Sequence, residues 1–128
     1  DLLVIFYEAL GFKTWKRELE QGQFLETLVD LKKARVETAK LKAPCGALLE
    51  LLEYRSHPEQ KEISPQASNQ LGFSHIALTV SSIDKTLECV HSCGGSLVNQ
   101  PATSPDGTVR VAYCHDPEGN LLELVEEI

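Results

Sequence analysis

Two glutamates in similar surroundings are the residues of this chain that most suggest chemistry. The segments ALLELLEY (47–54) and NLLELVEE (120–127) read almost alike, and each places a carboxylate, Glu50 or Glu123, inside an apolar run typical of a β-strand. A buried unpaired carboxylate is costly and persists only when it is paired, protonated or bound to a metal ion. The alternative is that each glutamate lies on the solvated face of a half-exposed sheet.

A histidine stands at a third strand-like segment, FSHIALTV (73–80). Alternation places His75 on one face of that segment with two small residues, as expected beside a cavity. A single strand histidine is more often structural than a ligand, but the recurrence of the glutamates favours a common site. We expect Glu50, His75 and Glu123 to converge on one point. Mixed imidazole and carboxylate ligands suit a divalent metal such as Zn, Ni, Mn, Fe or Co.

The elements that must position these side chains follow the hydrophobic periodicity. The first half predicts a helix over 2–10, strands over 12–19, 35–41 and 47–54, and a short helix or irregular loop over 24–31. Residues 55–71 are polar, contain two prolines and read as a linker. The second half predicts a strand over 73–80, a helix that begins after Ser81 and Ser82 and ends at Gly94 and Gly95, and strands over 96–99, 108–114 and 121–126.

The two halves therefore repeat one order of elements, which predicts an α+β fold from internal duplication. Module 1 (1–54) reads α-β-β-β and module 2 (72–128) reads β-α-β-β-β, within one domain of 128 residues. His75 precedes the helix-ending Gly94 by 19 residues, and the same distance counted back from Gly11 falls before residue 1. We expect the opening strand of module 1 to lie outside this sequence or to have been lost. A sheet left incomplete in this way favours a homodimer.

Composition narrows the classes of protein to consider. The formal net charge of -7 disfavours a nucleic-acid partner, because phosphate binding needs clustered lysines and arginines. No apolar run approaches the roughly 20 residues that span a bilayer, so we expect no membrane partner. The four cysteines lack the spacing of a disulfide framework, which favours reduced thiols and a cytoplasmic location.

Other candidate groups have simpler interpretations. Cys89 and Cys93, with His91 between them, resemble half a zinc site, but cysteines at this spacing are more often small core residues of an amphipathic helix. We expect solvated side chains for the turn residues His115 and Asp116, the linker residue His57 and the strand-end pair Glu126 and Glu127. Cys114 has no neighbour that would lower its pKa, and Tyr7 and Trp15 are expected in the core or at its rim.

Four segments carry a resemblance to a known family: FYEALGF (6–12), APCGALLELLEY (43–54), GFSHIALTVSSID (72–84) and DPEGNLLELVE (116–126). Together they resemble the vicinal oxygen chelate superfamily, which includes glyoxalase I, extradiol dioxygenases, and fosfomycin- and bleomycin-resistance proteins. The resemblance implies two tandem βαβββ modules whose curved mixed sheet encloses a cleft.

The resemblance also implies a site and an activity. Glu50, His75 and Glu123 match three of the family's four protein ligand positions, and the fourth falls on the missing first strand. The implied function is a divalent-metal-dependent lyase or isomerase of the glyoxalase I type, acting on a small oxygen-chelating substrate with Glu123 or Glu50 as general base. The alternatives are a metal-free small-molecule-binding protein like the bleomycin-resistance members, an extradiol-type dioxygenase, or a regulatory domain that retains the site as a relic.

Overall fold

The computed structural model describes residues 1–128 and confirms the α+β class. The chain divides into two compact units. Residues 11–62 form one, called here the central unit, and residues 1–10 together with 63–128 form the other, called the terminal unit. These units do not coincide with the sequence modules 1–54 and 72–128, which describe a repeat along the chain and stay a prediction.

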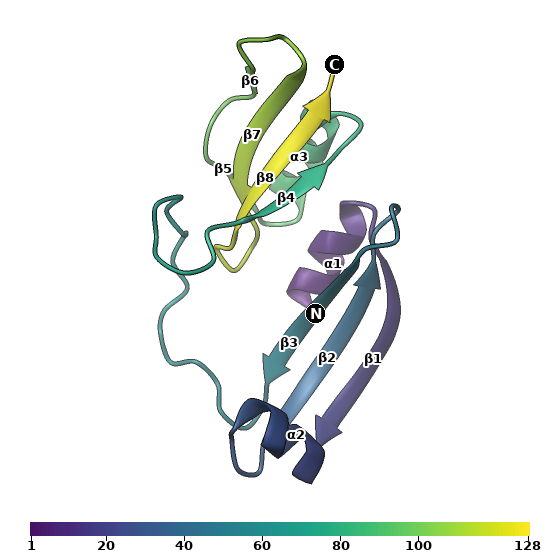
Figure 1. Cartoon of the computed structure of the whole chain (residues 1–128), viewed down its shortest axis with the longest axis vertical. Coiled ribbons are helices and arrows are strands. Elements are labelled where there is room, and N and C mark those ends of the chain that lie inside the picture. Colours follow the sequence, from purple (N-terminus) through teal and green to yellow (C-terminus); the bar gives the residue numbers. More distant parts are fainter. The chain divides into compact units, whose positions relative to one another are not determined.

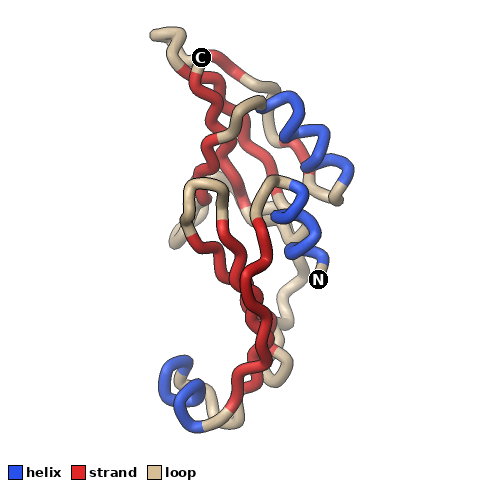
Figure 2. Tube along the Cα trace, turned by 90° about the vertical axis from the view of Figure 1, so that its right-hand side faces the viewer, coloured by secondary structure: helices blue, strands red, loops and turns tan.

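The central unit is a three-stranded antiparallel sheet with a short helix at one end (Figure 2). Its elements are β1 (Lys13–Gln21), α2 (Gln23–Val29), β2 (Arg35–Lys42) and β3 (Leu48–Tyr54), with the strand order β1-β2-β3. Apolar side chains gather where α2 meets the sheet: Leu25, Ala34 and Val36 are buried, and Val29, Leu31 and Tyr54 pack against them. The segment 24–31, for which the sequence predicted a short helix or an irregular loop, therefore forms a helix whose Leu25 packs into this cluster.

An irregularity interrupts the pairing of β1 with β2. Thr14 lies opposite Leu41 and Lys16 lies opposite Lys40, so Trp15 has no partner in the ladder. A β-bulge of this kind bends the strand and re-aims the side chain of the extra residue. The sequence alone gave no indication of it.

The terminal unit contains the second sheet and two helices (Figure 1). Its elements are α1 (Leu2–Ala9), β4 (Ile76–Thr79), α3 (Ile83–Ser92), β5 (Ser96–Leu97), β6 (Ala102–Thr103), β7 (Val109–His115) and β8 (Leu121–Glu127). The strand order is β4-β8-β7-β5, with β6 also paired to β7. β4 runs parallel to β8, while the other pairs are antiparallel, so the sheet is mixed.

Helix α3 covers one face of this sheet. Ser82 caps the helix, as predicted, by accepting a hydrogen bond from the Lys85 amide. The Ile83 amide, also at the start of α3, donates to Glu126 Oε2 at 2.8 Å. Alternation along β8 puts the fully buried Leu122 and Leu124 on the same face as Glu126. Glu123 consequently points to the opposite face of the sheet, away from α3.

The end of α3 is a crowded point of the core. A Cβ atom placed on Gly95 would come within 2.6 Å of the His115 carbonyl oxygen, 2.7 Å of Val90 Cγ1 and 2.9 Å of Phe6 Cε2. Those distances are shorter than any side chain tolerates, so Gly95 is required for close packing of the helix end against the strand and α1. The sequence prediction that glycines end this helix is confirmed.

Two strand predictions differ from the structure. β4 begins at Ile76 instead of residue 73, because the Ser74 hydroxyl donates to the Ser68 carbonyl oxygen at 3.0 Å and holds the preceding segment in an irregular path. The predicted strand over 96–99 is only Ser96–Leu97, and β6 was not foreseen, since two residues carry no readable period.

The two units differ in charge. The central unit holds 10 lysines and arginines against 9 aspartates and glutamates, whereas the terminal unit holds 2 against 10. The terminal unit therefore has a formal net charge of -8 and the central unit one of +1, which together give the -7 of the chain. No helix in the structure has the length and apolar character needed to cross a membrane.

Candidate functional site

His75 and Glu123 lie side by side on the face of the terminal sheet opposite α3. His75 Nε2 is 3.1 Å from Glu123 Oε2, and their side chains are 29% and 24% exposed. The pairing of β4 with β8 sets this contact, because Ala77, two residues after His75, lies directly opposite Glu123. The structure thus brings together two of the three predicted site residues.

A serine fixes which nitrogen of His75 carries a proton. Ser74 Oγ lies 2.9 Å from His75 Nδ1, and its single hydroxyl proton is directed to the Ser68 carbonyl oxygen. Nδ1 is therefore the donor to Ser74, and in the neutral ring Nε2 presents a lone pair. That lone pair faces a carboxylate oxygen of Glu123, so a proton or a cation must lie between the two atoms. A ligating histidine whose other nitrogen donates a hydrogen bond is a common arrangement at protein metal sites.

Tyr113 completes this group, and sequence reasoning did not identify it. It lies directly opposite Glu123 in the β7–β8 register, and its ring meets His75 edge to face at 5.2 Å between centroids. Burial raises the pKa of Tyr113, and the charge of Glu123 and a hydrogen bond to that carboxylate raise it further. The tyrosine consequently keeps its proton and donates a hydrogen bond to Glu123. Only the strand register could have revealed this partner, and nothing in the sequence around Tyr113 specifies that register.

Glu50 occupies a different environment in the central unit. It lies opposite Lys40 in the β2–β3 register, its Oε1 is 3.4 Å from Lys40 Nζ, and its side chain is 46% exposed. The neighbouring Leu48 and Leu52 are also exposed. The interpretation of Glu50 as an isolated charge on a buried face is therefore wrong. Its convergence with His75 and Glu123 stays a prediction, and the structure contains no metal-binding cluster of three or more His, Cys, Asp or Glu side chains.

The turn before β8 contains a buried polar network, whereas the sequence analysis predicted solvated side chains there. Asp116 is 3% exposed and accepts hydrogen bonds from the Glu118 amide, the Asn120 amide and side chain, and the Tyr7 hydroxyl. Burial, followed by the charge of Asp116 and this hydrogen bond, raises the pKa of Tyr7 well above its ordinary value. The prediction that Tyr7 lies in the core is confirmed, but the expectation that Asp116 is solvated is wrong.

Two further expectations of solvated side chains need correction. His115 is 9% exposed, and its Nε2 lies 2.8 Å from the Gln66 carbonyl oxygen. This contact anchors part of the predicted linker at residues 55–71 to β7. Glu126 accepts from the Ile83 amide and lies 3.4 Å from Arg110, so it stabilises the start of α3. Each group contacts a partner that is distant in sequence, which local patterns cannot reveal.

The four cysteines form no disulfide bond. Cys114 is fully buried, and burial, followed by the charge of Asp116, raises its pKa to about 11. A thiol that stays protonated at neutral pH is a poor nucleophile. Cys89 and Cys93 are partly buried on α3, and Cys45 is exposed.

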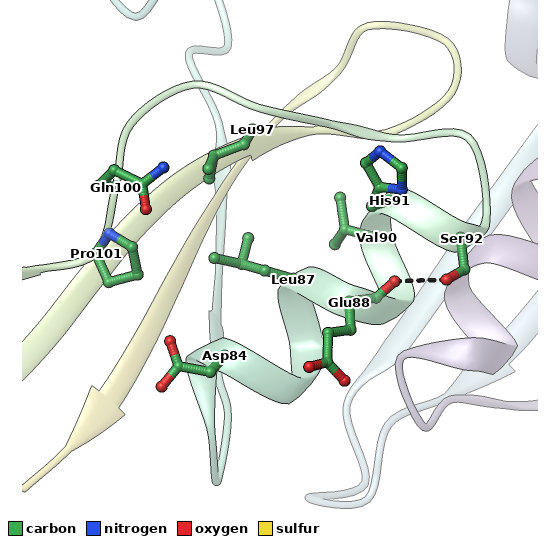
Figure 3. A pocket seen from close by; sticks show the side chains of 9 residues that line it. All are labelled: Asp84, Leu87, Glu88, Val90, His91, Ser92, Leu97, Gln100 and Pro101. Carbon is green, nitrogen blue, oxygen red and sulfur yellow. Dashed lines mark hydrogen bonds between the residues drawn. The ribbon is translucent and has the colours of Figure 1, made fainter.

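A hollow of about 470 Å³ lies between α3 and the segment that contains Leu97, Gln100 and Pro101, and it does not include the His75–Glu123 pair (Figure 3). Leu87, Val90 and Leu97 supply its apolar surface. Asp84 and Glu88 line it from α3, and Asp84 already binds Arg110 at 3.1 Å. The pKa of Asp84 is lowered by its hydrogen bond with Arg110 and by the arginine's charge. The ion-paired carboxylate at this hollow therefore has a structural role.

Curated relatives and solved structures agree on the family. A probable lactoylglutathione lyase from Synechocystis is 38% identical over 55 residues, which is 43% of this chain and 42% of that protein. A lactoylglutathione lyase from Escherichia coli O157:H7 is 33% identical over 55 residues, covering 43% and 41%. The matched segment thus spans about two fifths of these relatives.

The structural matches extend over nearly the whole chain. A glyoxalase family protein from Bacillus cereus is 26% identical, with a TM-score of 0.88 over 98% of this chain and 85% of that one. Glyoxalase I from Zea mays is 22% identical, with a TM-score of 0.67 over 99% and 40%, and supports the fold alone. The sequence model of the Glyoxalase/Bleomycin resistance protein/Dioxygenase superfamily matches residues 3–124, and the chain belongs to that superfamily.

Proposed function

We propose that this protein is a divalent-metal-dependent lyase or isomerase of the glyoxalase I type that acts on a small oxygen-chelating substrate. The observation that carries the proposal is the contact between His75 Nε2 and Glu123 Oε2 at 3.1 Å, with Nδ1 held as a donor to Ser74. Two acceptor atoms facing each other in this way suit an imidazole–carboxylate site for a borderline divalent ion such as Zn, Ni, Mn, Fe or Co.

The residues that would hold the ion are His75, Glu123 and, as a third ligand from the central unit, Glu50. A bound divalent ion would supply Lewis-acid stabilisation of charge on the substrate oxygens. The name lactoylglutathione lyase, carried by relatives that align over less than half their length, supports this class of reaction.

Glu123 is the group placed to move a proton. Its carboxylate is partly exposed on the free face of the sheet, so it can take a proton from a carbon next to a carbonyl and return it to the neighbouring carbon. Tyr113 and His75 hold the carboxylate in one orientation through the contacts already described. Glu50 is the alternative base, but its pairing with Lys40 at 3.4 Å favours Glu123.

The remaining parts of the proposal concern partners and location. A small molecule is the expected substrate, and a homodimer is expected because β1 and β3 each pair on one side only within the central sheet. The four free thiols support a cytoplasmic location. Light scattering tests the assembly: a dimer mass is expected, and a monodisperse monomer would contradict it.

Metal content separates the enzyme from a metal-free binding protein of the bleomycin-resistance type. After dialysis against a weak chelator, elemental analysis is expected to find about one equivalent of divalent metal per chain. The loaded protein is then given hydroxyacetone in D2O, and NMR follows exchange of the hydrogens next to the carbonyl. Metal-dependent exchange that is lost in Glu123→Gln supports the proposal. A chain that retains no metal and takes up none on addition would instead support the binding protein.

A further inference from the structure

A second hollow, of about 550 Å³, is built from the central unit alone. It is lined by the first residues of β1, including Lys13 and Trp15, and by the end of β2 and the turn after it, including Lys42 and Pro44. None of its lining residues belongs to the predicted metal site. Nothing in the proposed function accounts for it.

The backbone presents Trp15 to this hollow through an irregular strand. Trp15 is the extra residue of the β1 bulge, and the residue is 56% exposed. Bulges are found where a side chain has to be turned toward a site, and a large exposed aromatic ring is unfavourable in water unless something covers it. The exposed surface of the ring is therefore available to a ligand.

Two lysines without carboxylate partners flank the ring. Lys13 and Lys42 lie directly opposite each other in the β1–β2 register, which brings like charges together at a cost in stability. Lys42 Nζ is 4.5 Å from the centroid of the Trp15 ring. No salt bridge within residues 11–62 involves either lysine.

Neighbouring lysines on the same two strands are treated differently. Lys16 Nζ lies 2.7 Å from Glu18, and Lys40 Nζ lies 3.7 Å from Glu18 and 3.4 Å from Glu50. Carboxylates thus neutralise the other lysine pair of the sheet, whereas the pair beside Trp15 has no carboxylate partner. An anion placed between two adjacent ammonium groups would relieve this repulsion.

We propose that the hollow at Lys13, Trp15 and Lys42 binds a small anion that carries a flat aromatic ring. The carboxylate or phosphate group lies between the two ammonium groups, and the ring contacts the exposed part of the indole. This site is distinct from the His75–Glu123 pair in residues and in ligand charge. Its existence does not depend on the proposed metal chemistry.

The chain contains one tryptophan, so tryptophan fluorescence reports directly on this hollow. Phenyl phosphate is the probe, with inorganic phosphate and phenol as controls for charge alone and ring alone. Fluorescence is excited at the red edge of the indole absorption band, where the three probe compounds do not absorb. Phenyl phosphate is expected to give a saturable change and to bind about tenfold more tightly than inorganic phosphate, because the ring adds a stacking contact. Binding is expected to weaken as salt is added.

Substitutions of single lysines test whether Lys13 and Lys42 bind the anion. Lys13→Ala and Lys42→Ala are each expected to weaken phenyl phosphate binding about fivefold, whereas Lys16→Ala, which removes a lysine already paired with Glu18, leaves it unchanged. All three lysines are exposed on the sheet surface, and circular dichroism checks that each variant is folded. The proposal is overturned by no saturable change, by equal affinities for phenyl phosphate and inorganic phosphate, or by parent-like affinity in both lysine variants.

Discussion

Strands β3 and β8 begin with the same four residues, LLEL, yet their central glutamates have different partners. Glu50 in β3 lies opposite Lys40 and forms an exposed ion pair, whereas Glu123 in β8 lies opposite Tyr113 and contacts His75. The difference arises from the neighbouring strand and not from the repeated segment. The repeated sequence places a carboxylate at the same position of both strands. The residue on the neighbouring strand determines whether that carboxylate is neutralised by a lysine or is able to bind a cation.

The wider surroundings follow the same division. The terminal unit carries 10 acidic and 2 basic residues, so the field around Glu123 attracts cations. The central unit is nearly balanced, with a local excess of positive charge at Lys13 and Lys42 that favours anions. The units also differ in how they use polar groups: the terminal unit buries a network around Asp116, whereas the central unit relies on exposed ion pairs such as Arg55 with Glu37.

The largest expected effect comes from breaking the buried network of the terminal unit. Asp116→Ala removes the acceptor for four hydrogen bonds and leaves the buried Tyr7 hydroxyl without that partner. We expect the free energy of unfolding to fall by about 3 kcal/mol, measured by urea denaturation. The matched variant in the central unit is Glu37→Ala, which breaks exposed ion pairs and is expected to cost little. Equal losses in the two variants would contradict this contrast.

A smaller loss of stability is expected at alkaline pH, and it arises from buried groups of the terminal unit. In the unfolded chain Cys114 ionises near 9.0, but in the folded chain burial keeps its proton until about pH 11. The unfolded state binds fewer protons in this window, so the free energy of unfolding falls as pH rises, by up to about 1.4 kcal/mol per pH unit. Tyr7, whose pKa is also raised from 10.0, adds a further decline above that value.

Cys114→Ala isolates the thiol contribution. The variant loses some stability at neutral pH because its side chain is smaller, but its free energy of unfolding is expected to fall less steeply between pH 9 and 11. Urea titrations at several pH values give the two slopes. Parallel curves for the parent and the variant would show that the thiol does not contribute.

The smallest expected effect tests Tyr113 as a positioning residue for Glu123. Tyr113→Phe keeps the ring beside His75 and removes only the hydroxyl that hydrogen-bonds to Glu123. We expect metal affinity to fall about tenfold, the usual cost of losing a group that orients a ligand, with little change in stability. Tyr54→Phe, at the end of β3, is the matched control and is expected to leave the affinity unchanged. A metal affinity of Tyr113→Phe equal to that of the parent would show that the Tyr113 hydroxyl does not position Glu123.

Local signals in the sequence were sufficient for most elements and for the pair His75 and Glu123. The helix 83–92, its serine cap and its glycine end follow from spacing and residue type, as do the long strands. Tyr113, the buried Asp116 and the bulge at Trp15 could not be predicted in the same way. Each depends on strand register or on a partner distant in sequence, such as Tyr7 for Asp116 at a separation of 109 residues.

The central claim is that His75 and Glu123 bind a divalent cation, and Zn2+ titration by calorimetry tests it most directly. The titration uses a Cys45→Ser background, because the exposed thiol of Cys45 would itself bind Zn2+. His75→Ala and Glu123→Gln are expected to abolish binding with the fold intact, and Glu50→Gln, which removes the proposed third ligand, is expected to weaken it. Zn2+ binding in Glu123→Gln that equals binding in the parent would contradict the account.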